Sequence, residues 1–151
     1  MEEGPMTLTR KPRAVWNVCP EIDAAQGIIA QVYKDHGAEA VVTSAKDSKH
    51  SKESAHHQEP GDKRPAKAID LRIWNLFQKD EYKTKEWWGK AMEFSEELAR
   101  RLNEGRTLGN FYVILEKDHI HCEFSDSTPN IKAFAAGQYG YITKEVREAL
   151  V

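Results

Sequence analysis

The fold of this chain is set by a run in its last third, FYVILEKDHIHCEF at residues 111–124. The first five residues of the run are aromatic or aliphatic and predict a buried strand. The last six predict a second strand, joined to the first by three polar residues. His119 and His121 are two residues apart on that second strand, so both rings project from the same face. The run therefore predicts a pair of neighbouring strands that carries two histidines on one face.

The rest of the chain supplies helices and further strands around this pair. Apolar residues recur at helical spacing through 85–103, which predicts the main amphipathic helix. In chain order we expect a loose N-terminal arm at 1–12, a helix from Pro20 to Gly37, a strand at 40–43, an active-site loop at 44–66, a strand at 67–74, the main helix, the two strands of the run, and a last short helix from Thr143 to Leu150. This order predicts one α+β domain at 1–151, with a small, mainly antiparallel sheet packed against helices.

The composition of the chain limits the classes of function and partner that we expect. The 151 residues include 22 basic and 24 acidic ones, so the overall charge attracts neither nucleic acid nor an anionic membrane. The N-terminal residues lack a basic segment followed by an apolar one, and we expect no secretory signal and synthesis in the cytoplasm. Two cysteines, Cys19 and Cys122, do not form a disulfide framework. We expect a monomer with neither a nucleic-acid nor a membrane partner.

Histidines and carboxylates gather in two distant segments. Catalytic zinc takes three protein ligands and keeps one position open for water. A histidine within 54–57, Asp70 and a histidine within 119–121 would supply such a set. Asp118 and Glu116 are then spare carboxylates that can take a proton from water. The sequence thus predicts one zinc site divided between two parts of the sheet.

Structural roles for the same residues stay open at this point. His119 and His121 also suit a solvated strand face, and adjacent His56 and His57 suit a solvated loop. Asp70 stands between Ile69 and Leu71, and such a carboxylate needs a partner. That partner is either a metal ion or a basic side chain such as Arg72.

Several of these motifs together resemble the M15 family of zinc peptidases, which includes D-alanyl-D-alanine carboxypeptidases and phage L-alanyl-D-glutamate endolysins. The matching runs are Ser54-Ala55-His56-His57, Ala68-Ile69-Asp70-Leu71-Arg72 and Asp118-His119-Ile120-His121. They occur in the family's order within residues 20–125. The resemblance implies the fold that this family shares with murein endopeptidases and hedgehog domains.

The resemblance also implies a role for each matching position. It makes His56, Asp70 and His121 the zinc ligands. It makes Asp118 the acid that activates water and then protonates the leaving amine, and it places His119 beside the water or substrate. Ser54 would fix a ligand or contact substrate, and a basic residue of the preceding loop, with Lys46, Lys49 and His50 as candidates, would polarise the substrate carbonyl.

Two departures from the family pattern leave alternatives. The gap between His56 and Asp70 is longer than the family's, which keeps His57 as an alternative ligand. Position 118 is Asp where many members have Glu, which keeps Glu116 as an alternative base.

The resemblance implies a zinc-dependent peptidase that hydrolyses bacterial cell-wall peptides, as a carboxypeptidase or an endopeptidase. Without a secretory signal, the phage endolysin type, which acts on the wall after release, is favoured. The alternative is a catalytically inactive, metal-stabilised binding or phage structural domain of the same fold. Trp74 and Trp88 are expected either in the core or along a groove for glycan or peptide.

Overall fold

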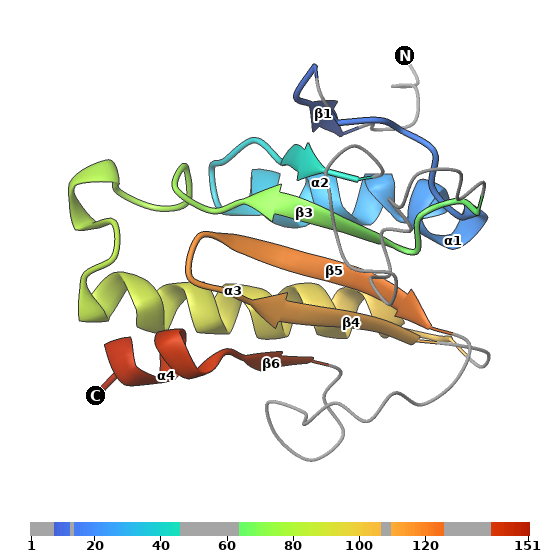
Figure 1. Cartoon of the computed structure of the whole chain (residues 1–151). Coiled ribbons are helices and arrows are strands. Elements are labelled where there is room, and N and C mark those ends of the chain that lie inside the picture. The colour runs from blue at the N-terminus through green and yellow to red at the C-terminus, as the bar shows by residue number, and fades with distance from the viewer. Residues whose placement is uncertain (1–7, 13, 46–63, 107–109, 126–139) are drawn as a thin grey trace.

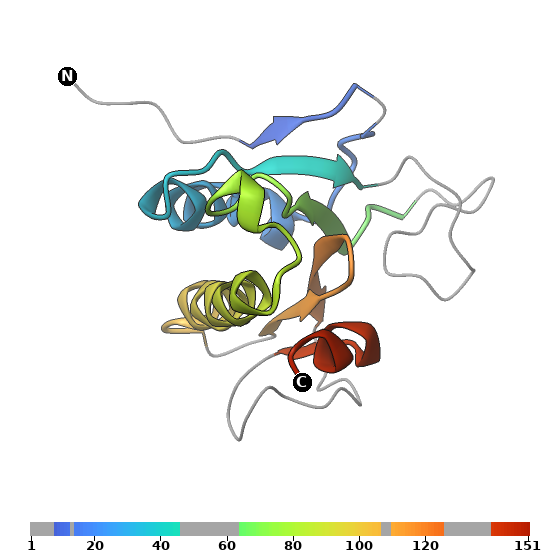
Figure 2. The ribbon, with the colours of Figure 1, turned by 90° about the vertical axis from the view of Figure 1, so that its left-hand side faces the viewer.

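In the part of the chain that the structure describes, six strands form one sheet, and α2 and α3 cover one of its faces (Figures 1 and 2). The computed structural model describes residues 8–12, 14–45, 64–106, 110–125 and 140–151. In spatial order the strands are β1 (Thr9–Arg10), β2 (Val41–Ser44), β3 (Ala68–Arg72), β5 (His119–Ser125), β4 (Asn110–Leu115) and β6 (Gly140–Ile142).

The inner strand pairs are antiparallel and the two edge pairs are parallel. β2 with β3, β3 with β5, and β5 with β4 run antiparallel, whereas β1 joins β2 and β6 joins β4 in parallel. The expected α+β class is confirmed, and so are the two strands of the 111–124 run. The edge strands β1 and β6 were not expected, and β1 lies within the segment that the sequence suggested was a loose arm.

The helices follow the expected order with one break. They are α1 (Pro20–Ala24), α2 (Gln26–Asp35), the 3-10 turn η1 (Lys79–Glu81), α3 (Lys85–Asn103) and α4 (Lys144–Ala149). A single helix was expected from Pro20 to Gly37, but Ala25 separates α1 from α2. Gln26, at the break, binds the backbone of Asp23 and accepts from the amide of Leu8, which anchors the N-terminal segment. No helix in the described ranges is long and apolar enough to cross a membrane.

Hydrophobic burial between the sheet and α2 and α3 forms the core. α3 begins at the Thr84 cap, whose hydroxyl accepts from the amide of Trp87. Trp87, Phe94 and Leu98 are buried, as the helical periodicity predicted. The Trp87 indole also donates to the carbonyl of Leu76 at 3.0 Å, so its polar atom is satisfied in the core. Alternate residues of β3, β4 and β5 point into this layer, which leaves their other side chains on the opposite face.

Asn103 connects the end of α3 to the start of β4. Its side-chain amide donates to the carbonyls of Ala99 and Phe111, at 2.7 and 2.9 Å, and its oxygen accepts from the Phe111 amide at 2.7 Å. One side chain therefore satisfies backbone groups of both a helix and a strand.

We expect Asn103→Ala to lower the free energy of unfolding by about 2 kcal/mol, because three partly buried backbone groups lose their partner. Urea denaturation followed by circular dichroism measures this loss. Glu104→Ala, at the exposed neighbouring position, is the matched control and should change stability by less than about 0.5 kcal/mol. Equal stabilities of the two variants would contradict the bridging role of Asn103.

Candidate metal centre

The pairing of β3 with β5 brings the predicted site residues together. Asp70 lies directly opposite His121, and Arg72 lies opposite His119. Residues opposite one another in a sheet project from the same face, so Asp70, His119 and His121 share the face that α2 and α3 do not cover. Residues that are about fifty positions apart in sequence thus become neighbours through strand register alone.

His121 is held by a carboxylate at each ring nitrogen. Its Nδ1 lies 3.1 Å from Asp70 Oδ1, and its Nε2 lies 3.0 Å from Glu123 Oε1. Burial lowers the pKa of this imidazole, but the hydrogen bonds and charges of Asp70 and Glu123 outweigh burial and raise the pKa to about 9. The metal-free site therefore holds His121 as a cation near neutral pH.

His119 lies among three carboxylates. Its Nδ1 is 2.5 Å from Asp118 Oδ1, and its Nε2 is 3.0 Å from Glu116 Oε2 and 3.5 Å from Asp70 Oδ1. Burial lowers the His119 pKa, whereas Glu116, Asp70 and Asp118 raise it to a net value of about 9. The ring consequently separates the two candidate bases, with Glu116 on the side of Asp70 and Asp118 on the other.

Asp70 has the histidine partners that its position requires. Its carboxylate is almost fully buried, 7% exposed, between apolar neighbours on β3. The alternative expectation was a pair with Arg72. The Arg72 guanidinium instead stacks over the Trp74 ring, 4.5 Å from the ring centroid. Asp70 is thus the residue that both histidines share.

The remaining predicted site residues lie outside the described ranges. These are the proposed ligand His56 with its alternative His57, and the proposed substrate-binding residues Ser54, His50 and Lys49 with the further candidate Lys46. Within the described residues, no group of three or more histidine, cysteine, aspartate or glutamate side chains could hold a metal ion. A zinc centre at Asp70 and His121 therefore needs a ligand from outside these ranges.

The two cysteines are not candidate ligands. Cys19 and Cys122 are buried, and Cys122 projects from the opposite face of β5 to His121. Burial raises the pKa of the Cys122 thiol to about 12 and also raises that of Cys19. Both thiols stay protonated at neutral pH, as expected for core residues.

Glu123 is a site residue that the sequence interpretation did not assign. It lies two residues after His121 on the same face of β5, and it binds the ring nitrogen that points away from Asp70. Histidines that bind metals usually donate their second N–H to a carboxylate, which fixes the ring and the tautomer. The period-two spacing from His119 to His121 to Glu123 was the sequence feature that could have identified it.

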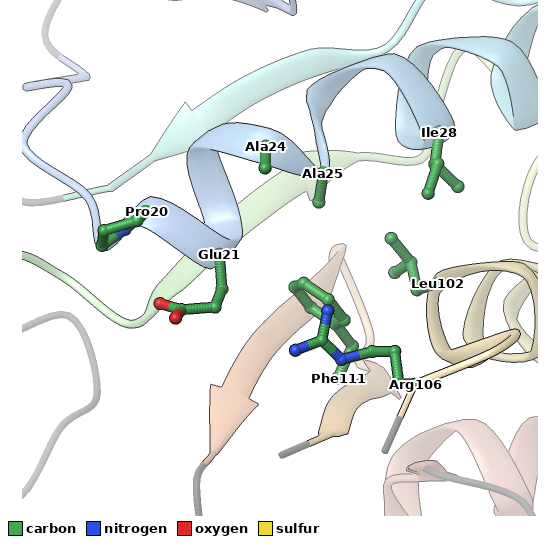
Figure 3. Close-up of a pocket in the computed structure, with 8 residues that line it drawn as sticks. All are labelled: Pro20, Glu21, Ala24, Ala25, Ile28, Leu102, Arg106 and Phe111. Carbon is green, nitrogen blue, oxygen red and sulfur yellow. The ribbon is translucent and has the colours of Figure 1, made fainter. Parts of the chain in front are cut away.

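A separate pocket of about 400 Å³ opens between α1, α2, the end of α3 and β4 (Figure 3). Its lining includes the apolar residues Ile28, Leu102 and Phe111 and the charged residues Glu21 and Arg106. The Arg106 guanidinium stacks over Phe111 and Phe124, 5.1 and 5.0 Å from their ring centroids. The pocket shares no residue with the histidine cluster, so the cluster remains the candidate for chemistry.

Comparisons with known proteins add no assignment. The sequence matches no family model, and neither a curated protein nor a solved structure matches the chain. The function must therefore be argued from the site itself.

We expect the metal-free protein to lose stability as the pH rises from about 6.5 to about 9. The His119 and His121 pKa values are raised in the fold, so the folded state binds more protons than the unfolded state in this window. The stabilisation is complete below pH 6.5 and disappears above pH 9. The expected loss is about 3 kcal/mol for the pair, since both imidazoles depend on Asp70 and do not contribute independently. Chemical denaturation across the pH range in a chelator measures this loss.

Asp70→Asn is the matched control for this pH dependence. The substitution keeps the shape of the side chain but removes the shared charge, so the slope of stability against pH should fall by about half. A wild-type protein whose stability is flat between pH 6.5 and 9 would contradict the assignment of cationic histidines.

Proposed function

We propose that this chain is a zinc-dependent peptidase that hydrolyses peptides of bacterial peptidoglycan. The observation that carries the proposal is the pairing of Asp70 with His121 across β3 and β5, with Glu123 behind the histidine. The motif order supports the same function, because Asp70 and His121 are two of the three positions that resemble the ligands of the zinc peptidases.

The spacing of the donor atoms fits zinc. Two ligand atoms of a tetrahedral zinc site lie about 3.3–3.6 Å apart. Asp70 Oδ1 lies 3.1 Å from His121 Nδ1, slightly less than this separation. We propose Asp70, His121 and His56 as the ligand set, in which two neutral imidazoles and one carboxylate would leave a bound zinc ion with a net positive charge. A zinc ion held there would acidify a bound water and polarise a substrate carbonyl.

His119 could supply a positive charge beside the substrate. Asp118 fixes its Nδ1, while its Nε2 faces Asp70 and Glu116. Three surrounding carboxylates favour the protonated ring. We propose that the protonated His119 stabilises negative charge on the substrate, while Asp118 protonates the leaving amine.

Asp118 and Glu116 are the two candidate bases. Asp118 matches the family's catalytic position and its side chain is 60% exposed, so substrate and water can reach it. Glu116 contacts the His119 nitrogen that faces Asp70. We propose Asp118 as the acid and base, with Glu116 as the group that orients the Nε2 side of His119.

The proposed substrate is a wall peptide, bound by a monomer that acts on the wall after release from the cytoplasm. Ser54, His50 and Lys49 are proposed to contact this peptide. Neither nucleic acid nor a membrane is a proposed partner.

We expect the purified protein to carry about one zinc ion per chain, and both Asp70→Ala and His121→Ala to abolish zinc binding. Glu123→Gln should weaken zinc binding by about tenfold, because it removes only the carboxylate that orients His121. Metal analysis and competition with a chromophoric chelator measure these effects. His36→Ala, a histidine that pairs with Glu97 on α3, is the control and should retain zinc.

His56→Ala beside His57→Ala identifies the third ligand in the same assay. Loss of zinc in the His56 variant alone supports the proposed set. If His56→Ala retains zinc and His57→Ala loses it, the third ligand is His57 and not His56.

We expect Asp118→Ala to retain zinc but to lower peptidoglycan hydrolysis by about a thousandfold, since it removes the proposed proton acceptor. Glu116→Ala should lower the rate of hydrolysis by about tenfold, because Glu116 is proposed to act on His119 and not on water. Release of free amino groups from purified peptidoglycan measures the rate. If Glu116→Ala shows the larger loss, the two roles are exchanged.

A zinc-loaded wild-type protein that cleaves no wall peptide would overturn the peptidase proposal. That result would favour the metal-stabilised binding domain of the same fold.

A further inference from the structure

Trp74 is an exposed aromatic side chain beside the histidine cluster. It is 46% exposed, whereas Trp87 and Trp88 are buried in the core. The sequence favoured the core over a groove for both Trp74 and Trp88, and the structure separates the two residues. Of the strongly exposed large hydrophobic side chains in the described ranges, Trp74 is the aromatic one. Tryptophan is enriched at binding interfaces, because its ring is apolar while its indole N–H can donate a hydrogen bond.

Arg72 holds the Trp74 ring in a fixed orientation. The guanidinium lies 4.5 Å from the centroid of the ring, within the range of a cation–π contact. The Arg72 backbone is itself anchored, because its carbonyl accepts from the buried hydroxyl of Tyr33 at 2.8 Å. Trp74 therefore presents a rigid platform that loses little conformational entropy when a ligand stacks on it.

The platform adjoins the proposed catalytic residues. Arg72 lies opposite His119 in the register of β3 and β5. His119 contacts Glu116 and Asp118 in the turn between β4 and β5. Figure 1 shows that the end of β3 and this turn lie at the same end of the sheet. An aromatic face, a guanidinium and carboxylates thus lie along one edge of the site.

This combination fits a neutral sugar ring. One face of a pyranose presents C–H groups that pack on an indole, and its hydroxyls donate to carboxylates and accept from a guanidinium. A nucleic acid would also stack on Trp74, but its phosphates would meet Asp70, Glu116 and Asp118 and be repelled. A purely apolar partner would make no hydrogen bond with the Arg72 guanidinium or with the exposed Asp118 carboxylate.

We propose that Trp74, held by Arg72, is a stacking subsite for a neutral N-acetylhexosamine of the wall glycan. The identity of the glycan rests on the proposed function, whereas the stacking chemistry rests on the residues described above. The subsite would hold the glycan strand while an attached peptide reaches the Asp70 and His121 centre. Binding of the wall and hydrolysis of its peptides would then take place in the same domain.

The test is isothermal titration of the full chain with chitotetraose, a soluble N-acetylglucosamine tetramer. Trp74→Ala is expected to weaken binding by about tenfold or more, and Trp74→Phe by only about threefold because an aromatic face remains. Val15→Ala, which truncates another half-exposed apolar side chain outside the site, is the control and should bind as the wild type does. Thermal unfolding checks that each variant is folded.

Three results would overturn the proposal: no binding of chitotetraose by the wild type, equal binding by Trp74→Ala, or equal losses in the Val15 and Trp74 variants. Binding of a single-stranded oligonucleotide through Trp74 in place of the sugar would also overturn it. A separate assay of the wild type on a sugar-free wall peptide tests the peptidase. Peptide cleavage without sugar binding would contradict only the subsite proposal. Sugar binding without peptide cleavage would contradict only the peptidase proposal.

Discussion

The contact between Asp70 and His121 is the constraint on which the centre of this structure depends. A carboxylate buried between Ile69 and Leu71 is costly unless a cation or a metal ion compensates for it. His121 provides that compensation from the neighbouring strand at 3.1 Å. A slip of one residue by either strand would turn that strand's member of the pair toward the helices and break the pair. The contact therefore favours the observed register, and this register positions the candidate site.

The sequence predicted the interior elements better than the edges, and the reason is physical. β4, β5 and α3 bury long periodic runs, so their apolar spacing was sufficient to identify them. The edge strands β1 and β6 are only two and three residues long and depend on partners distant in the chain, so no local pattern predicted them. The break at Ala25 was likewise not predicted, because the apolar stripe continues across it. Tertiary contacts made by Gln26 accompany that break.

For the site, sequence spacing identified the residues but not their order in space. His119, His121 and Asp70 were expected together, and the structure brings them together on one face. Spacing alone could not place Asp118 and Glu116 on opposite sides of the His119 ring, because their separation depends on the turn between two strands. It also gave Glu123 no role, although the alternation that pairs the histidines places Glu123 on the same face. The ligand His56 and the substrate contacts lie outside the described ranges and remain predictions.

The charges of the cluster bear on the proposed metal centre. Four carboxylates, from Asp70, Glu116, Asp118 and Glu123, surround two imidazoles. Among these six side chains, with both rings protonated, the formal charges of four carboxylates and two imidazolium ions sum to two negative charges. Repulsion between like charges is weakly screened where the site is partly buried. A divalent cation that displaced a proton from His121 would relieve the excess and keep Glu123 bound to the far side of the ring, which is the arrangement that metal-binding histidines require.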